Sequence, residues 1–323
     1  MDARRTFIQL YWQGKNLDSW INEYITSFQY DDPSEGESDS LSITLLDTEK
    51  KWIGVWIPTK GDYILAAINN VQCGAFLIDD MSFSGRPMQA SIKGVSAPAN
   101  TGFKNTKVSK TWEKVSVQEI ASQIAGKYGL SFVYDGPGIV IDSLEQSEQP
   151  DSEFLENICK KYGLSMKLYS YKIIIYDDAT YESKNAVATI DEEEMLSWSF
   201  NSTLDGTYTG GKIQYTNPND ESTIDLVVGD TTRLLESTEK ADNLADAKRI
   251  IVSAVNDANK VAETISFTLP GLLHQLYSTQ VINITGLEAA NGRYYITKVS
   301  HSVGSGYTLT VEARKIQNRL AVA

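Results

Sequence analysis

The pentapeptide KYGLS occurs at residues 127–131 of this chain and again at residues 161–165. Each copy closes a run of apolar residues with helical spacing. The two runs are Val117, Ile120, Ala121, Ile124, Ala125 and Tyr128, then Phe154, Leu155, Ile158, Cys159 and Tyr162. The repeat therefore predicts two helices, each followed by the same kind of turn.

Both predicted helices have start and stop signals. Ser116 and Glu119 have the spacing of a capping box, in which each side chain satisfies a free backbone N–H near the start of the helix. Asp151, after a proline, is the predicted N-cap of the second helix. Gly129 and Gly163 follow the helices and suit the left-handed conformation of a helix C-terminus.

After each helix the sequence predicts a strand pair, at residues 130–134 with 138–141 and at 164–169 with 172–176. The middle domain is therefore predicted to be a tandem of helix plus hairpin at residues 111–183. Nothing in this range has the pattern of a catalytic motif.

Strand patterns flank the middle domain on both sides. Residues 1–110 alternate between short apolar runs and turns, which favours a small antiparallel barrel or sandwich. The expected strands there are 7–12, 21–30, 41–45, 63–68, 73–78 and 88–95. Residues 184–323 are expected to form a second barrel with a helical insertion at about 240–260. Its expected strands are 198–200, 208–215, 223–228, 264–269, 278–284, 293–299 and 307–313.

Composition excludes several classes of protein. The chain has 323 residues, 41% of them hydrophobic, and a net charge of −13 without a basic cluster. Specific nucleic-acid binding by phosphate neutralisation is therefore not expected, although nucleic acid could slide past such a surface. No apolar run has the length of a membrane helix. Residues 1–5 lead into a strand pattern and not into an export signal.

Two acidic stretches have more than one interpretation. Residues 31–40, DDPSEGESDS, are either a solvated, flexible loop or an arm that orders against a neighbouring subunit on assembly. Residues 139–156 contain six acids and no lysine or arginine. They are either a solvated face or a polar contact surface.

The sequence predicts no catalytic, cofactor-binding or metal-binding residue. Cys73, Cys159, His274 and His301 are the only cysteines and histidines, and none has the close-spaced partner typical of a zinc site. His301 is expected to be a satisfied histidine at the end of a strand and not a general base. With 42 acids in the chain, chance carboxylate pairs carry no information about hydrolysis. We therefore expect no cofactor and no enzymatic activity.

A set of short motifs, in a fixed order, resembles the phage tail hub proteins of the late-control-D type. The motifs are GAFLIDD at 74–80, SGRP at 84–87, KTWE at 110–113, QSEQPDSEFL at 146–155, YGL at 162–164, GRYYI at 292–296, VSH at 299–301 and GYT at 306–308. They span most of the chain.

This resemblance implies an α+β, mainly β fold with two tube-protein-like antiparallel β-barrels flanking the duplicated middle domain. It also implies a homotrimeric baseplate hub of a contractile phage or phage-tail-like bacteriocin. Such a hub joins the hexameric tail tube to the trimeric central spike, and its further partners would be tape-measure and wedge baseplate proteins. It would be made in the bacterial cytoplasm and assembled into the tail baseplate. Because only a short tail follows residue 315, spike or enzyme modules are expected in separate proteins.

Two alternatives stay open. The chain could be a cell-wall hydrolase at the tail tip, which would need a polar cleft holding groups with perturbed pKa values. It could also be a carbohydrate-binding module with Trp52 and Trp56 as exposed sugar platforms.

Overall fold

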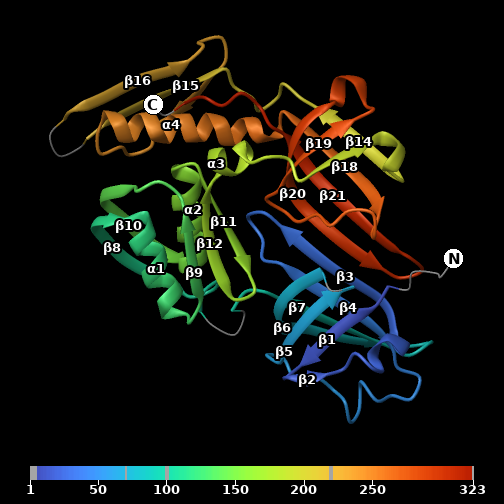
Figure 1. The fold of residues 1–323 in the computed structure, drawn as a ribbon. Coiled ribbons are helices and arrows are strands. Elements are labelled where there is room, and N and C mark those ends of the chain that lie inside the picture. Colours follow the sequence, from blue (N-terminus) through green and yellow to red (C-terminus); the bar gives the residue numbers. More distant parts are fainter. Residues whose placement is uncertain (1–5, 70, 99–101, 218–220, 322–323) are drawn as a thin grey trace.

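The computed structural model describes residues 6–69, 71–98, 102–217 and 221–321. It confirms the mainly β, α+β class (Figure 1). Two β-rich regions lie on one side of the molecule, and the middle of the chain lies on the other. Residues 1–5, where no export signal is expected, lie outside the described residues.

The first β half contains β1 to β7. Its strands follow the order β3-β4-β7-β6-β5-β1-β2 with antiparallel neighbours. In β4, every second residue is buried, because one face of the strand packs on the core. The bounds are β1 (Ile8–Trp12), β2 (Lys15–Asn16), β3 (Ile25–Pro33), β4 (Ser40–Leu46), β5 (Tyr63–Ile68), β6 (Val71–Ser84) and β7 (Gln89–Val95), with a 3-10 turn at Ile21–Glu23.

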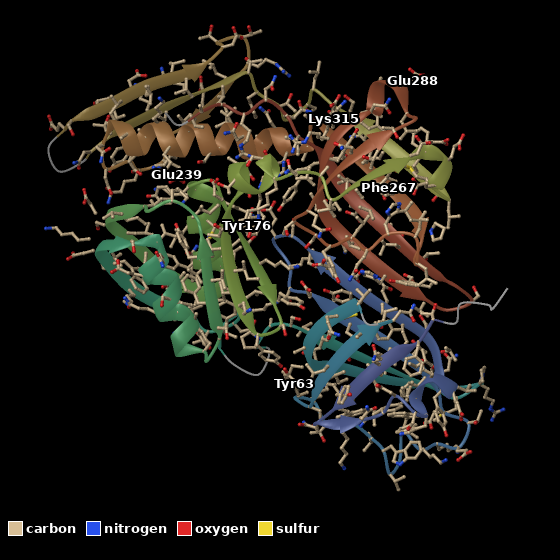
Figure 2. All side chains as sticks on the ribbon, viewed as in Figure 1. Tyr63, Tyr176, Glu239, Phe267, Glu288 and Lys315 are labelled. Carbon is tan, nitrogen blue, oxygen red and sulfur yellow. The ribbon has the colours of Figure 1, made fainter. Side chains whose placement is uncertain are left out.

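The second β half contains six strands in the order β13-β19-β20-β21-β18-β14. All neighbours are antiparallel except β13 and β19. Phe267 of β18 is buried in its core and is labelled in Figure 2. The bounds are β13 (Ala188–Asp191), β14 (Ser197–Ser202), β18 (Glu263–Pro270), β19 (Val281–Thr285), β20 (Gly292–Val303) and β21 (Tyr307–Lys315), with 3-10 turns at Glu192–Glu194 and Glu288–Ala290.

One long strand joins the two halves into a single 13-stranded sheet. The first part of β20, residues 292–295, pairs with β19, and residues 298–303 pair with β3. Among the described residues, no ladder joins β1 to β3 or β13 to β14. The outer edge of β1 is covered by a side chain instead, because Asn22 accepts from the N–H of Ile8 at 2.9 Å and donates to its carbonyl at 2.8 Å.

The middle part, residues 107–183, contains both predicted helices. The capping box of Ser116 and Glu119 is present. Gly129 and Gly163 have φ angles of 66° and 72°, as expected. The bounds are β8 (Lys107–Ser116), α1 (Val117–Lys127), β9 (Ser131–Asp135), β10 (Val140–Pro150), α2 (Asp151–Lys161), β11 (Leu164–Tyr169), β12 (Lys172–Asp177) and α3 (Asp178–Ser183).

Two details of the predicted duplication are wrong. The second copy ends in a β11–β12 hairpin, but the strands after the first copy do not pair with each other. Instead, β9 lies parallel to β12, and the 11-residue β10 pairs with β8. That long ladder places Trp112 of β8 against Phe154 of α2, with ring centroids 6.2 Å apart, and this contact buries both side chains.

Asp151 is also not the N-cap of α2. Pro150 occupies that position, and Asp151 is the first helical residue, with only 2% of its surface exposed. Its carboxylate accepts from Lys127, Tyr128 and Gln146 at 2.7, 2.7 and 2.8 Å. These bonds lower the pKa of Asp151, against the effect of burial.

The helical insertion is larger than the predicted 240–260. An excursion at residues 210–261 consists of β15 (Gly210–Thr216), β16 (Thr223–Gly229), β17 (Leu234–Ser237), α4 (Leu244–Ala258) and a 3-10 turn at Asn259–Val261. Figure 1 shows α4 between this small sheet and the middle part. Ile250 and Ile251 of α4 share a core with α2, because the helix is apolar on both of these sides. The predicted domain bounds 1–110, 111–183 and 184–323 stay a prediction.

Candidate functional site

The acidic segment at residues 31–40 is the most unusual feature of the structure. The predicted solvated, flexible loop was wrong, because the segment is ordered within its own chain, and a contact with a neighbouring subunit stays a prediction. Asp32 is 3% exposed and Asp39 0% exposed. The segment runs from the end of β3 to the start of β4 and lies against the middle part. Asp32 and Asp39 therefore do not belong to a solvated loop, although Glu37 between them is exposed.

Lys167 of β11 pairs with both buried aspartates. Its amine forms ion pairs with Asp32 and, at 2.8 Å, with Asp39. It also donates to the carbonyl of Pro33 at 2.6 Å and to Ser278 Oγ at 3.2 Å. The backbone N–H of Ser278 donates to Asp32 at 2.8 Å. One lysine thus connects the first β half, the middle part and the second β half.

Tyrosines complete this contact. Tyr30 donates its hydroxyl to Asp39 at 2.7 Å. Tyr176 of β12, labelled in Figure 2, donates to the carbonyl of Ser34 at 3.0 Å, and Tyr295 of β20 donates to Tyr176 at 3.0 Å. Burial raises the pKa of Asp39 to about 7, an effect that the attraction of Lys167 only partly offsets.

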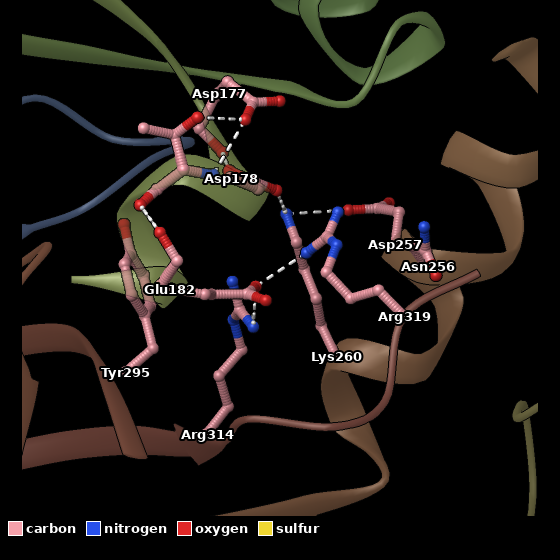
Figure 3. A network of polar contacts seen from close by, with 12 residues as sticks. Asp177, Asp178, Glu182, Asn256, Asp257, Lys260, Tyr295, Arg314 and Arg319 are labelled. Atoms are coloured by element: carbon pink, nitrogen blue, oxygen red, sulfur yellow. Dashed lines mark hydrogen bonds and ion pairs between the residues drawn. The ribbon is translucent and has the colours of Figure 1, made fainter. Parts of the chain in front are cut away.

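A second buried cluster surrounds Lys260, just after α4 (Figure 3). Its amine lies 3.0 Å from Glu35, 2.9 Å from Asp178 and 2.9 Å from Asp257. Ser165 donates to Glu35 at 2.5 Å and lies 2.6 Å from Asp178. The acidic segment therefore also contacts the excursion. The nearby carboxylates raise the pKa of Lys260 above its usual value despite burial.

Beside this cluster, Glu182 of α3 accepts from two arginines, as Figure 3 also shows. Arg314 of β21 lies 2.6 Å from its carboxylate and Arg319 lies 2.7 Å away. Glu182 and Arg314 are 3% and 5% exposed. Together with Lys167 and Lys260, these residues form what we call the charged junction. It connects all four parts of the chain, and its most deeply buried members are Asp39, Asp178, Asp32, Glu182 and Arg314.

The ion pairs of the charged junction hold parts of the chain together. Each of its lysines has two or three carboxylate partners, so the positive charge is compensated in the fold. Buried ion pairs of this kind favour one relative orientation of the parts that they join. A sequence signal existed for Lys167: it lies in the mostly apolar strand LSMKLY, and a lysine buried there needs a partner of opposite charge.

The acids of the other acidic stretch, residues 139–156, differ in their exposure to solvent. Asp151 is buried in the contacts described above, while Asp142, Glu145, Glu148 and Glu153 are exposed and Glu156 is half-buried. The acids of this stretch therefore lie mostly in solvent, and Asp151 is the buried exception.

The cysteines and histidines lie in separate environments. Cys73 and Cys159 are unpaired and buried in different cores. His274 lies 2.5 Å from Glu194. His301 is 2% exposed, lies between the rings of Tyr30 and Tyr307, and bonds to the Tyr307 hydroxyl at 2.8 Å through Nδ1. Within the described residues, no group of three or more His, Cys, Asp or Glu side chains is arranged to hold a metal ion.

The two tryptophans considered as sugar platforms belong to one aromatic cluster. Trp52 is 2% exposed and stacks with Trp12 and Trp20 at 6.0 and 6.1 Å. Trp56 packs on Trp20 at 5.2 Å and is 37% exposed. Trp52 is therefore a core residue with no face available to a sugar. In the described part of the chain, no helix has the length and apolarity needed to cross a membrane.

No family model and no curated protein matches the chain. Among solved structures, the chain resembles the 43 kDa tail protein of prophage MuSo2 from Shewanella oneidensis and a tail protein from Neisseria meningitidis MC58. Each has a TM-score of 0.77 and 12% identity; the alignments cover 96% of this chain, with 98% of the first protein and 96% of the second. A third is the E. coli c3393 protein, a type VI secretion system component with structural similarity to the T4 bacteriophage tail proteins gp27 and gp5. Its TM-score is 0.60 at 11% identity, over 93% of this chain and 76% of that one.

Proposed function

We propose that this chain is a structural component of a tail: the baseplate hub of a contractile phage or phage-tail-like bacteriocin. In this proposal, three copies form a ring that joins the hexameric tail tube to the trimeric central spike. The observation that carries it is the single sheet of two β halves joined by β20, in a fold shared along nearly its whole length with phage tail proteins.

In this proposal, the two β halves let a trimer join a six-fold tube to a three-fold spike. A six-fold tube and a three-fold spike cannot bind through equivalent contacts unless an adaptor presents six similar surfaces from three chains. Each copy would supply two, the first and second β halves, which are small and mainly antiparallel and lie side by side in Figure 1. In the ring, each half would complete a tube-protein-like barrel.

The charged junction suits such an adaptor, because a hub must keep its surfaces in a fixed orientation under mechanical load. Lys167 and Lys260 connect the middle part and the excursion to the sheet through buried ion pairs. Substituting either lysine would leave carboxylates unpaired in the interior. The junction therefore favours one arrangement of the four parts.

The net charge of −13 suits a central channel that nucleic acid passes without binding. Tape-measure and wedge baseplate proteins are proposed as further partners. The chain would be made in the bacterial cytoplasm and would function in the assembled baseplate. We propose no enzymatic role, so the purified chain should release no muropeptides from peptidoglycan.

The mass of the purified chain in solution tests the proposal. Light scattering over a concentration series should reach three times the 35.8 kDa of one chain, and electron micrographs should show rings with a central hole. Where the chain alone is monomeric, the measurement is repeated with the central spike protein of the same particle. A monomer under both conditions, or a two-fold dimer, would overturn the proposal. Muropeptide release that one carboxylate substitution abolishes would favour the hydrolase alternative instead.

A further inference from the structure

Both free ends of the 13-stranded sheet carry exposed apolar residues. The path of paired strands runs from β14 at one end to β1 and β2 at the other. Beside β1, residues 50–60 project an apolar loop, and beside β14 an apolar surface lies next to the 3-10 turn at Glu192–Glu194. Contiguous exposed apolar patches often mark contacts between proteins.

The loop at the β1 end, which we call the basic knob (residues 50–60), is rigid. Val55 is 88%, Ile57 51% and Ile53 40% exposed. The buried carboxylate of Asp47 accepts from the backbone N–H groups of Trp52 and Ile53 at 3.0 and 3.1 Å. Stacking on the tryptophan cluster fixes the same loop. The apolar side chains are therefore presented in one conformation, which lowers the entropic cost of binding.

The surface at the β14 end, which we call the acidic patch (residues 191–198 and 272–274), is also contiguous. Leu196 is 62%, Trp198 45%, Leu272 42% and Leu273 48% exposed. The bond between His274 and Glu194, at 2.5 Å, connects the two segments. Trp198 donates to Glu192 at 3.1 Å, which holds its ring beside the acids.

The charges of the two regions are opposite. The basic knob has three lysines, Lys50, Lys51 and Lys60, in a chain with a net charge of −13, and Lys51 is ion-paired with Glu49 just before the loop. The acidic patch has four successive acids, Asp191 to Glu194, and no lysine or arginine. Apolar centres with charged rims of opposite sign are the pattern of matched protein surfaces.

We propose that the basic knob of one copy binds the acidic patch of a second copy of this chain. Because the two surfaces differ and lie at opposite ends of one sheet, the contact is head-to-tail, and in the proposed trimer the rotation between copies closes it into a ring. This inference rests on the proposed trimeric hub and names the surfaces that hold it together. It also covers the exposed β14 edge, which is open to unwanted strand pairing in a single copy.

A mixing experiment tests the contact. Val55→Asp places a charge at the centre of the knob, and Leu196→Asp does so in the patch; both positions are exposed, so folding is unaffected. Each variant alone should lose assembly, with an affinity at least about tenfold weaker. Mixed together, they should form a dimer and no larger species, because one intact knob and one intact patch remain. Leu204→Asp is the matched control: Leu204 is 76% exposed and lies beyond the other end of β14, so this variant should assemble like the wild type.

The outcomes separate this inference from the hub proposal. A trimeric wild type whose Val55→Asp and Leu196→Asp variants also form trimers overturns the knob-to-patch contact and leaves the hub standing. A Leu196→Asp variant that dimerises alone through its knob overturns it as well, because the contact would then be two-fold. Substitution of Lys50, Lys51 and Lys60 by glutamate should prevent assembly. If the further substitutions Glu192→Lys and Glu193→Lys restore assembly, this supports the contact between the basic knob and the acidic patch. A wild type that stays monomeric, alone and with the spike protein, overturns both.

Discussion

Lys260 forms an ion pair with Glu35, a residue 225 positions earlier in the chain, at a distance of 3.0 Å. The same amine lies 2.9 Å from Asp178 at the start of α3. A single ammonium group therefore connects the excursion, the first β half and the middle part. Because Asp178 is 2% exposed, its charge depends on this partner.

Lys260→Met should lower the free energy of unfolding by about 3 kcal/mol or more, since removal of one partner leaves a buried charge without compensation. Urea unfolding followed by circular dichroism measures the change. The control is Lys160→Met, because Lys160 pairs with Glu156 at 3.1 Å with its side chain 54% exposed, and its loss should cost less than about 0.5 kcal/mol. Equal effects of the two substitutions would contradict the structural role of Lys260.

Gly129→Ala and Gly163→Ala should differ in cost although their turns share one sequence. Both glycines have positive φ, so alanine should cost about 1 kcal/mol at either position. A Cβ at Gly129 meets nothing within 4 Å, whereas one at Gly163 lies 2.8 Å from Ser253 Oγ and 3.4 Å from its Cβ. Thermal unfolding should therefore show the larger loss for Gly163→Ala. The double variant Gly163→Ala with Ser253→Gly should reduce that loss, and its failure to do so would exclude the clash as the cause.

Local signals in the sequence predicted most of the elements. The Schellman turn after α1 is present, with Leu130 N donating to the carbonyl of Ala125 at 2.9 Å. The strand at residues 63–68 has the predicted bounds. These features depend on residues close in sequence, and their periodicity and turn chemistry are readable there.

Strand pairing and the charged junction depend on distant residues, so the sequence did not show them. The pairing of β20 with β3 joins Val303 to Phe28, and nothing near either residue encodes it. The repeated KYGLS sequence led us to predict the same hairpin after both helices. After the first helix, however, β10 pairs with β8 over a long ladder and is not free to form a hairpin with β9. Residues 31–40 have the composition of a solvated loop, and their partner Lys167 lies more than 120 residues away.

Asp39→Asn should remove a pH dependence of stability. The pKa of Asp39 is raised from 3.8 to about 7 in the fold, chiefly by burial. The folded state therefore binds this proton more tightly than the unfolded state does. The resulting stabilisation is present below pH 4 and is lost as the pH rises to about 7. The unfolding free energy of the wild type minus that of Asp39→Asn should therefore decrease as the pH rises from about 4 to about 7. A difference that does not change with pH would show that Asp39 is ionised throughout.

His301→Phe should change the pH dependence in the opposite direction. Burial lowers the pKa of His301 from 6.5 to about 4, so the fold holds the neutral ring. The unfolded chain takes up this proton below about pH 6.5, and the folded chain only below about pH 4. Stability is therefore present above pH 6.5 and is lost as the pH falls through this window, by roughly 3 kcal/mol at most.

Phenylalanine keeps the ring between Tyr30 and Tyr307 but cannot be protonated, so the His301→Phe variant should lack this loss. Unfolding midpoints in urea at pH 7, 6, 5 and 4 measure it. Tyr307→Phe is the control: it removes the 2.8 Å bond to His301 Nδ1 and shifts stability at every pH, but it keeps the histidine and the loss in acid. If wild type and His301→Phe lose stability in parallel from pH 6.5 to 4, the acid sensitivity originates elsewhere, and His301 is not neutralised by its burial.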